Sequence, residues 1–308
     1  MKKKILVTGC TGLVGHGICL SLISKGHEVW GTSRSKIISN HSLFHPIVLD
    51  LEDELSLKEI TKTLDQVDIL IHNAALIPGK NKYSFENYFN VNFNATKNLI
   101  KKSIQTGIKQ IIYISGSPIS LQREINNKIS EDSPYDPKND YGTTKALSEI
   151  LCINHINNNK IPLSVLRFTA PYGYINKSKA VFSTFLNNAK NGTPITLWGN
   201  GNRTQTFTFV DDIGDACCQV INKNSSGIYT ITGPEKTTMK NLARKVIQAF
   251  PNSDSKIIFE NKIDPLEGLS ISISTSKAEK ELGFFSQYDL SRGINKIVNA
   301  DESINFFI

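Results

Sequence analysis

Short apolar runs alternate with longer amphipathic stretches through the first half of the chain. Apolar runs of strand length predict strands at residues 4–8, 27–32, 46–49, 67–72, 109–115 and 162–168. Apolar residues at helical spacing predict helices at residues 13–25, 55–64, 85–106 and 141–157, and Gly26 fits the C-cap of the first. Strands that alternate with helices predict a doubly wound α/β fold, in which helices cover both faces of a parallel sheet.

The pattern changes after residue 170. Gly and Pro become more frequent, and the strands predicted at residues 195–198, 206–210 and 227–232 are short. Helices are expected at residues 212–221, where Asp211-Asp212 fits an N-cap, and at 237–250 and 276–282. We therefore expect residues 1–170 to carry the large sheet. Residues 171–308 should form a smaller lobe packed closely on it, with a cleft at the carboxyl ends of the strands.

Composition excludes several classes of protein. Hydrophobic residues make up 39% of the 308 and charged residues 20%, which fits a folded core. The 35 Lys and Arg exceed the 28 Asp and Glu by seven, without the mixture of basic and aromatic residues typical of nucleic-acid binding. No apolar run approaches the roughly 20 residues of a membrane span, and the basic start lacks the apolar segment of a secretory signal. We expect a soluble, cytoplasmic protein with no nucleic-acid or membrane partner.

The cysteines predict no metal site. They are five in number, none has C-x-x-C spacing, and they occur at Cys10, Cys19, Cys152, Cys217 and Cys218. An odd count without ligand spacing is typical of reduced, structural thiols and does not fit a zinc site.

A glycine-rich turn joins the first predicted strand to the first predicted helix. Gly9, Gly12 and Gly15 form a G-x-x-G-x-x-G pattern. Gly9 permits a sharp bend, Gly12 a close approach of a pyrophosphate, and Gly15 close packing of the helix, whose N-terminus offers N–H groups to the anion. The position between a strand and a helix distinguishes the pattern from an ordinary tight turn. We predict a Rossmann-type NAD(P)-binding domain at residues 1–170, whose phosphate loop uses Gly9, Thr11, Gly12, Leu13, Val14 and Gly15.

The end of the second strand indicates which dinucleotide is bound. A carboxylate there binds the ribose 2′-hydroxyl of NAD, whereas an arginine suits the 2′-phosphate of NADP. The chain has Ser33-Arg34 and no acid at this place, which favours NADP. NAD remains the alternative if Arg34 is an ordinary solvated loop residue. Asp50 and Leu51, after the third strand, are candidates to bind the adenine amino group and to pack on the adenine ring.

Tyr141 and Lys145 are four residues apart on a predicted helix, which places them on one face. An ammonium close to the phenol is expected to lower the pKa of Tyr141 towards neutrality, so that the tyrosine exchanges a proton with an alcohol or a carbonyl. Alone, such a pair is usually a surface contact. Ser115 and Ser117, however, follow a buried strand whose carboxyl end lies over the same cleft, where a hydroxyl can bind the reacting oxygen.

Taken together, these motifs resemble the extended short-chain dehydrogenase/reductases, the NAD(P)-dependent epimerase/dehydratase family that acts on nucleotide sugars. The resemblance covers almost the whole chain. It is carried by Thr8-Gly9-x-x-Gly12-x-x-Gly15, Asp50-Leu51, His72-Asn73-Ala74-Ala75, Asn92…Thr96…Asn98-Leu99, Ser115-x-Ser117, Tyr141-x-x-x-Lys145, Arg167…Tyr172-Gly173, Gly199-Asn200-Gly201…Phe207…Val210-Asp211-Asp212 and Ser276-Lys277-Ala278…Leu282-Gly283-Phe284.

The resemblance implies roles for particular residues. Tyr141 corresponds to the acid/base, Lys145 to its partner and ribose ligand, and Ser117 to the hydroxyl that orients the sugar oxygen. Residues that would line the cofactor channel are Ala74, Ala75, Ser115 and Pro171. Asn92 is interpreted as a structural link between helix and sheet, because buried Asn usually satisfies backbone groups. Similar proteins are usually homodimers formed through helices such as those predicted at residues 85–106 and 141–157.

The departures from the family pattern limit the reaction. Dehydratases of the family carry an Asp-Glu pair directly after the active-site hydroxyl, but here Pro118 and Ile119 follow Ser117, which disfavours a 4,6-dehydratase. Gln205 stands where the family often has the arginine that binds the nucleotide diphosphate. Arg203 is the candidate replacement, with a surface arginine as the alternative. An Asn common in the family is replaced by Ala170.

Three functions remain open at this point. The favoured one is a reductase of a 4-keto-6-deoxy nucleotide sugar that uses NADP(H), with Tyr141 as the acid. The second is a nucleotide-sugar 4-epimerase that keeps NAD tightly bound. The third is a non-catalytic regulator that senses NADP through the same fold, which the presence of Ser117, Tyr141 and Lys145 disfavours.

Overall fold

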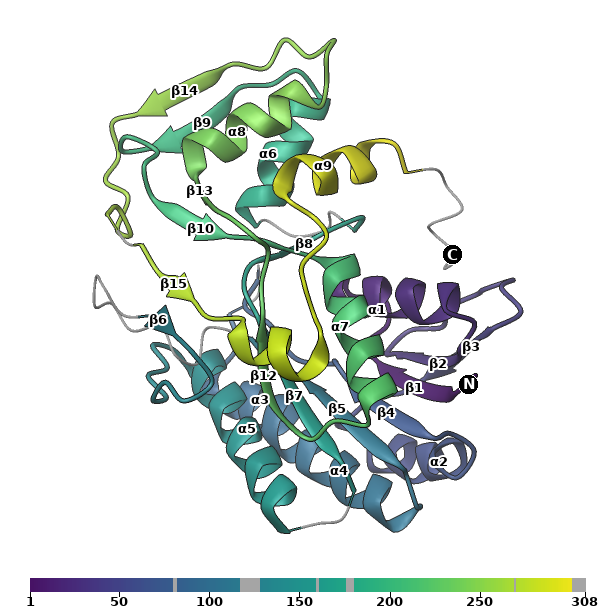
Figure 1. Ribbon diagram of the computed structural model, residues 1–308. Helices are drawn as coiled ribbons and strands as arrows, with labels where there is room; N and C mark the ends of the chain where they lie inside the picture. The colour runs from purple at the N-terminus through teal and green to yellow at the C-terminus, as the bar shows by residue number, and fades with distance from the viewer. Residues whose placement is uncertain (80–81, 117–127, 159–160, 176–179, 269, 301–308) are drawn as a thin grey trace.

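A seven-stranded parallel sheet forms the centre of the molecule, in a computed structural model that describes residues 1–79, 82–116, 128–158, 161–175, 180–268 and 270–300 (Figure 1). Every neighbouring pair in this sheet is parallel. In spatial order the strands are β3 (Phe44–Val48), β2 (Glu28–Ser33), β1 (Lys4–Thr8), β4 (Ile69–His72), β5 (Gln110–Ile114), β7 (Leu163–Phe168) and β12 (Gly227–Ile231). The predicted doubly wound, Rossmann-type fold is confirmed.

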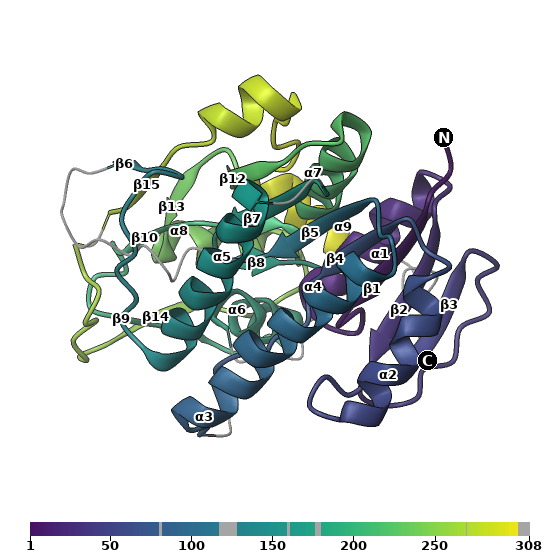
Figure 2. The same cartoon turned by 90° about the horizontal axis from the view of Figure 1, so that it is seen from below.

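Alternate residues of each strand face two different helical layers. One layer consists of α1 (Leu13–Ser24), α7 (Val210–Lys223) and the π-helix η3 (Ala278–Leu282), and the other of α2 (Glu54–Leu64), α4 (Ala95–Gln105) and α5 (Asp140–Asn158). Ile5 and Val7 of β1 pack with the first layer, whereas Leu6 packs with the second, seen nearest the viewer in Figure 2. Since both faces are buried, the strands are almost continuously apolar, which made them visible in the sequence.

The chain returns to this sheet after residue 171. The strand predicted at residues 227–232 was assigned to the smaller lobe, but β12 pairs in parallel with β7, from Gly227 opposite Ser164 to Ile231 opposite Phe168. The helix predicted at 212–221 is α7, which packs along α1 on the same sheet. These placements differ from the prediction because strand pairing between distant segments leaves no local signal in the sequence.

The second lobe has its own apolar core beside the carboxyl ends of the strands. That core includes Phe182, Leu197, Leu242 and Ile294. Its helices are α6 (Val181–Lys190), α8 (Met239–Gln248) and α9 (Leu290–Val298), and its strand pairs are β9 (Ile195–Trp198) with β14 (Ile257–Glu260), and β10 (Thr204–Thr206) with β13 (Lys236–Thr238). Two further pairs, β8 (Pro171–Tyr172) with β11 (Thr208–Phe209) and β6 (Lys128–Ile129) with β15 (Ser272–Ile273), lie between this lobe and the sheet (Figure 1).

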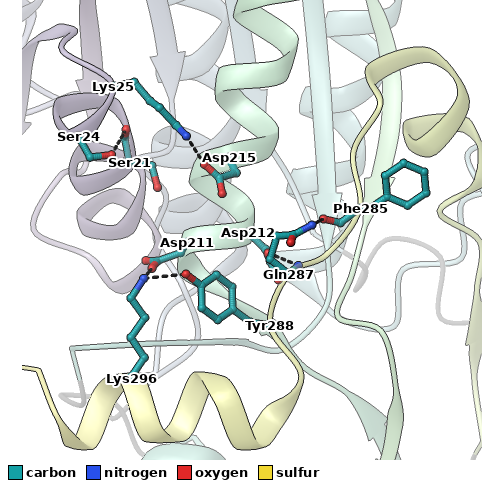
Figure 3. A network of polar contacts seen from close by, with 10 residues as sticks. All are labelled: Ser21, Ser24, Lys25, Asp211, Asp212, Asp215, Phe285, Gln287, Tyr288 and Lys296. Atoms are coloured by element: carbon teal, nitrogen blue, oxygen red, sulfur yellow. Dashed lines mark hydrogen bonds and ion pairs between the residues drawn. The ribbon is translucent and has the colours of Figure 1, made fainter.

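The start of α7 joins the two parts of the molecule (Figure 3). Asp211 Oδ2 accepts a hydrogen bond from Lys296 Nζ of α9 at 2.7 Å, and the same ammonium donates to Tyr288 Oη at 2.7 Å. Asp212 accepts from Ser286 Oγ at 2.6 Å and from Gln287 N–H at 2.9 Å. The predicted N-cap at Asp211-Asp212 is therefore wrong. Both carboxylates lie in the first turn, where the helix dipole favours them, and they hold the segment that leads to α9.

The helix predicted at residues 85–106 is continuous but irregular. It consists of α3 (Phe85–Tyr88), the π-helix η1 (Phe89–Asn94) and α4. A π-helical turn shifts the faces of the flanking segments relative to each other and frequently occurs at functional sites. Here it turns the buried Asn92 towards the loop after β4.

All five cysteines are free and buried, as expected for structural thiols. Within the described ranges, no group of His, Cys, Asp or Glu has an arrangement that would hold a metal ion. Among the helices of those same ranges, none has the length and the apolar character needed to cross a membrane.

Candidate active site

The strand order reverses between β1 and β4. From β1 the chain proceeds through β2 and β3 to one edge, and from β4 through β5 and β7 towards the other. In open α/β sheets, ligands bind at the carboxyl ends of the strands beside such a reversal. The glycine-rich turn follows β1 and the Asn73-Ala74-Ala75 segment follows β4, so the two predicted cofactor loops lie next to each other.

The three glycines of the turn serve different purposes. Gly9 has a φ of +69°, and a Cβ added to it would lie 2.9 Å from Ala74 Cα. A Cβ on Gly15 would lie 2.2 Å from the carbonyl oxygen of Gly9. Both positions therefore need glycine for the chain to pack. A Cβ on Gly12 would meet no described atom closer than Gly9 O at 3.4 Å, and no described side chain caps the start of α1. The exposed space in front of this helix N-terminus fits a pyrophosphate.

A directed chain of hydrogen bonds fixes the loop after β4. Ala74 N–H donates to Thr8 Oγ1 at 3.0 Å, and Thr8 Oγ1 lies 2.8 Å from His72 Nδ1. At the other side of the ring, His72 Nε2 lies 2.8 Å from Thr96 Oγ1, whose own proton goes to Asn92 O. Thr96 must therefore accept from Nε2–H, and Nδ1 must accept from Thr8. Burial lowers the pKa of His72 to about 3, so the ring stays neutral and holds this loop at neutral pH.

Asn92 reinforces the same loop. Its Oδ1 accepts from Leu76 N–H at 2.7 Å, and its Nδ2 donates to Leu76 O at 3.1 Å and to Thr144 Oγ1 at 3.2 Å. The side chain connects η1, the loop after β4 and α5. These contacts agree with the structural interpretation of Asn92 made from the sequence.

The predicted catalytic pair lies at the start of α5, beside the end of β5. Lys145 is buried, and its Nζ donates to the carbonyl of Ile114, the last residue of β5, at 2.8 Å. The same ammonium lies 4.2 Å from the centre of the Tyr113 ring. Tyr141, one turn earlier on α5, makes an edge contact with Tyr88, whose ring centre is 6.1 Å away. The fold therefore fixes the lysine through the strand and the tyrosine through α3.

The electrostatics of the pair differ from the prediction. Lys145 was expected to lower the pKa of Tyr141, but burial, with a smaller contribution from Tyr88, raises it to about 12. Burial also lowers the pKa of Lys145 to about 8, although the nearby carboxylate of Glu149 acts to raise it. The cause is desolvation: Lys145 is buried and Tyr141 partly so, and loss of water around each group is the largest contribution to its shift. At neutral pH Tyr141 is a protonated phenol, which is the form that donates a proton.

Ser115 is the described hydroxyl nearest the end of β5 in sequence. Its side chain is 3% exposed, and its Oγ has no hydrogen-bond partner among the described residues. A buried hydroxyl in this condition retains a donor and an acceptor for a ligand. Ser117, the other predicted hydroxyl, together with Pro118 and Ile119, lies outside the described residues.

A buried arginine network underlies the catalytic helix. Arg167 of β7 donates to Glu149 Oε2 from Nε at 2.9 Å and from Nη2 at 2.7 Å. Its Nη1 donates to the backbone carbonyl of Glu131 at 3.2 Å. Tyr135 Oη also donates to Glu149 Oε2, at 3.1 Å. The side chains of the ion pair are 5% and 0% exposed. Glu149 is one turn beyond Lys145, so the network fixes the helix on which Tyr141 and Lys145 lie.

The residues predicted to select the cofactor lie at the ends of β2 and β3. Arg34 is exposed just after β2, and no ion pair or hydrogen bond of its side chain is found among the described residues. Ser33 is buried, and its hydroxyl donates to Ser35 O. Asp50 accepts from Glu52 N–H at 3.0 Å, and Leu51 is buried beside it. Arg34 is thus a free cation at the place where the sequence predicts a 2′-phosphate.

The second lobe carries the residues predicted to bind the substrate. Gln205 lies on β10, opposite Thr237 of β13. Arg203 precedes β10, and its Nε is 3.2 Å from Asp264 Oδ2. Arg203, the residue predicted to bind the diphosphate, is therefore neither a solvated surface arginine nor an unpaired cation. Pro171 lies in β8, where the chain leaves the sheet.

A model of the NAD dependent epimerase/dehydratase family matches residues 5–232. The chain belongs to this family.

Relatives in the family carry out more than one reaction. A Bacillus subtilis protein named as a UDP-glucose epimerase is 29% identical over 84% of this chain and 86% of its own length. The human dTDP-D-glucose 4,6-dehydratase is 25% identical over 85% of this chain and 78% of its own. A UDP-glucuronic acid 4-epimerase from Bacillus cereus, solved in complex with UDP-glucuronic acid and NAD, superposes with a TM-score of 0.82 at 23% identity, over 96% of this chain and 98% of that one. Membership makes this chain an enzyme of the NAD-dependent nucleotide-sugar epimerase/dehydratase type.

The residues of this family member fit a dinucleotide. The open space at Gly12, the unpartnered Oγ of Ser115 and the free cation at Arg34 lie at the carboxyl ends of β1, β5 and β2. Together they offer donors for a pyrophosphate and for a further hydrogen bond along one edge of the sheet, with the cation of Arg34 at the end of β2.

Sequence reasoning missed several residues around the site. Glu149 repeats the four-residue spacing from Tyr141 through Lys145, so helical periodicity gave a signal for it. Tyr88 and Asp264 gave none, because their contacts join segments far apart in the chain.

Proposed function

We propose that the protein reduces a 4-keto-6-deoxy nucleotide sugar with NADPH, using Tyr141 as the acid. The observation that carries this proposal is the protonated phenol of Tyr141 beside the buried ammonium of Lys145 at the end of β5. A reduction of a carbonyl needs a proton for the new alkoxide, and a partly buried phenol with a raised pKa holds that proton at neutral pH.

In this mechanism the bound nicotinamide supplies the hydride, and the protein binds and orients the reactants and delivers the proton. The loop around Gly12 binds the pyrophosphate, and Ala74 and Ala75, in the loop that Thr8 and His72 hold, line the channel beside it. Ser117 and Ser115 orient the sugar oxygen and the cofactor. Tyr141 then delivers its phenolic proton to the oxygen, and Lys145 stabilises the tyrosinate that forms.

Cofactor choice is proposed to depend on Arg34. Replacing Arg34 with Ser should weaken NADPH binding by about 10- to 100-fold, because a charge-assisted bond to the 2′-phosphate is lost. NADH binding should change less than about twofold. Titration of both cofactors by fluorescence measures this, with Lys36→Ser, an exposed cation two residues on, as the control. Equal loss for both cofactors would show that Arg34 does not read the 2′-phosphate.

The rate should depend on pH through Lys145. Its pKa of about 8 means that the ammonium is charged below pH 8 and neutral above it. Because the charge stabilises the tyrosinate, kcat should fall as the pH rises through about 8. A plot of log kcat against pH measures this, with Lys145→Arg as the comparison, since arginine keeps its charge over the whole range. A flat profile to pH 10 in the wild type would contradict the role of Lys145.

A 4-epimerase that recycles tightly bound NAD is the second candidate, supported by the epimerases among the relatives. The nucleotide released from the denatured, purified protein distinguishes the two. A reductase should release little nucleotide and consume added NADPH, whereas an epimerase should release stoichiometric NAD and leave added NADPH untouched. A non-catalytic regulator predicts binding of NADPH without turnover of any nucleotide sugar.

A homodimer is part of the proposal. Phe85, Phe89 and Phe93 stack along α3 and η1, with ring centres 5.7 and 5.0 Å apart, and Ile150 of α5 is 49% exposed. Apolar residues on two adjacent helices suit a self-complementary contact. A sedimentation mass of one chain at micromolar concentration would contradict the proposed homodimer.

A cytoplasmic location is also proposed. The buried, free thiols are consistent with it.

A further inference from the structure

The loop between β14 and β15 places a carboxylate on Arg203. Asp264 Oδ2 lies 3.2 Å from Arg203 Nε, and the two side chains are 10% and 23% exposed. In Figure 1 this loop descends from β14 to β15 past the start of β10. Among ion pairs of the described ranges, only Arg167–Glu149 has both partners less exposed. Solvent therefore screens the Arg203–Asp264 attraction weakly, and the carboxylate offsets much of the positive charge at this position.

Buried Arg167 and partly buried Arg203 are bonded in different ways. Arg167 donates from Nε and Nη2 to one oxygen of Glu149, in a well-directed network. The Nε of Arg203 is buried and lies close to Asp264, yet it has no properly directed hydrogen bond within the described part of the chain. Asp264 thus neutralises Arg203 without satisfying this donor. A ligand oxygen placed along the N–H direction would gain a charge-assisted bond that the carboxylate does not make.

Asp264 has other hydrogen-bond partners that would hold it in place when a ligand binds Arg203. Its Oδ1 accepts from Leu266 N–H at 3.0 Å, and its carbonyl accepts from Glu267 N–H at 3.0 Å. Glu267 in turn accepts from Asn200 N–H at 3.2 Å, in the turn between β9 and β10. The loop therefore stays anchored through the oxygen and the backbone that do not face Arg203. When a ligand binds Arg203, Asp264 loses only the contact between its Oδ2 and Arg203 Nε.

We propose that Asp264 is a specificity-determining residue that occupies Arg203 until a diphosphate oxygen displaces it. The inference rests on the proposed function, because it assigns Arg203 to the diphosphate of a nucleotide sugar. A neutral sugar or a nucleoside offers no anion and cannot compete with the carboxylate. A diphosphate competes because it brings more charge and more acceptor oxygens to the guanidinium. Asp264 thus lowers affinity for anionic ligands that bind Arg203, less for a diphosphate than for a singly charged anion, and leaves the affinity of uncharged ligands, which do not bind the guanidinium, unchanged.

Calorimetric titration of the full-length protein tests this with UDP, dTDP, pyrophosphate and uridine as probes. Asp264→Asn keeps the side-chain shape and removes the charge, so affinity for pyrophosphate and for the preferred nucleoside diphosphate should rise about tenfold. Uridine affinity should stay within twofold. Glu267→Gln removes one charge from the same loop without touching Arg203 and should change diphosphate affinity less than threefold. Asp264→Ser, checked by its melting temperature, provides a second variant if the amide disturbs the loop.

Two results would overturn the inference, and they are distinguishable. If the wild type binds a nucleoside diphosphate and Asp264→Asn binds it equally or more weakly, Asp264 is only a structural tie, and the proposed function stands. If neither protein binds any diphosphate or pyrophosphate, the proposed function and the inference both fail. Tighter binding of diphosphate and uridine alike would also contradict the inference, since it would show a general effect on the lobe.

Discussion

Replacing Tyr141 with Phe should reduce kcat by about 10²- to 10⁴-fold, because the substitution removes the proton donor and leaves the ring in place. The affinity for NADPH should stay within about twofold, since the phenolic oxygen is the only atom lost. Steady-state turnover of a 4-keto-6-deoxy nucleotide sugar, followed by NADPH absorbance, measures the first quantity, and fluorescence titration measures the second.

The matched control for this variant is Tyr229→Phe. Tyr229 lies on β12, away from the predicted catalytic residues, and its hydroxyl makes a long contact of 3.5 Å with Ser226 O, so its loss should leave kcat within about twofold. Turnover of Tyr141→Phe at the wild-type rate would refute the assignment of the acid. Loss of both turnover and cofactor binding would indicate damage to the fold.

Replacing Arg167 with Met should lower the free energy of unfolding by about 3–5 kcal/mol, because it leaves the carboxylate of Glu149 buried and unpaired. The double variant Arg167→Met with Glu149→Leu should recover most of this loss, since apolar side chains of similar volume often replace a buried ion pair without net cost. Denaturant unfolding followed by circular dichroism measures both. Arg244→Met, at an exposed position on α8, is the control and should change stability by less than about 0.5 kcal/mol.

An Arg167→Met variant as stable as the wild type would show that the network beneath α5 does not hold the helix. That outcome would also weaken the argument for how Tyr141 and Lys145 are positioned, because Glu149 lies one turn beyond Lys145 on the same helix.

The large sheet was predictable because its strands are buried on both faces. β1 was predicted at its observed bounds, and β2, β4, β5 and β7 within two residues. The lobe that follows was less predictable. Helices α6 and α9 were not anticipated, and the strand predicted at residues 206–210 is split between β10 and β11, with Val210 already in α7. Short elements in a small core depend more on tertiary contacts than on local pattern.

The candidate active site was likewise only partly predictable from the sequence. Spacing placed Tyr141 and Lys145 on one helical face, and the structure shows that face at the end of β5. Spacing gives no measure of depth, so the direction of the pKa change at Tyr141 was wrong. It also gives no account of distant partners: Asp212 is bonded by residues more than 70 positions later, and Arg203 is paired with Asp264 from the loop between β14 and β15.

The most direct test of the proposed function follows the hydride. The protein is incubated with a 4-keto-6-deoxy nucleotide sugar and NADPH that carries deuterium at the transferred position of the nicotinamide, and the product is weighed by mass spectrometry. Reduction predicts one deuterium in each product molecule and an equal amount of NADP formed. A parallel incubation replaces the 4-keto sugar with a 4-hydroxy nucleotide sugar. A 4-keto sugar that stays unreduced, together with an unlabelled epimer of the 4-hydroxy sugar formed without loss of NADPH, would contradict the proposed reduction and identify an epimerase.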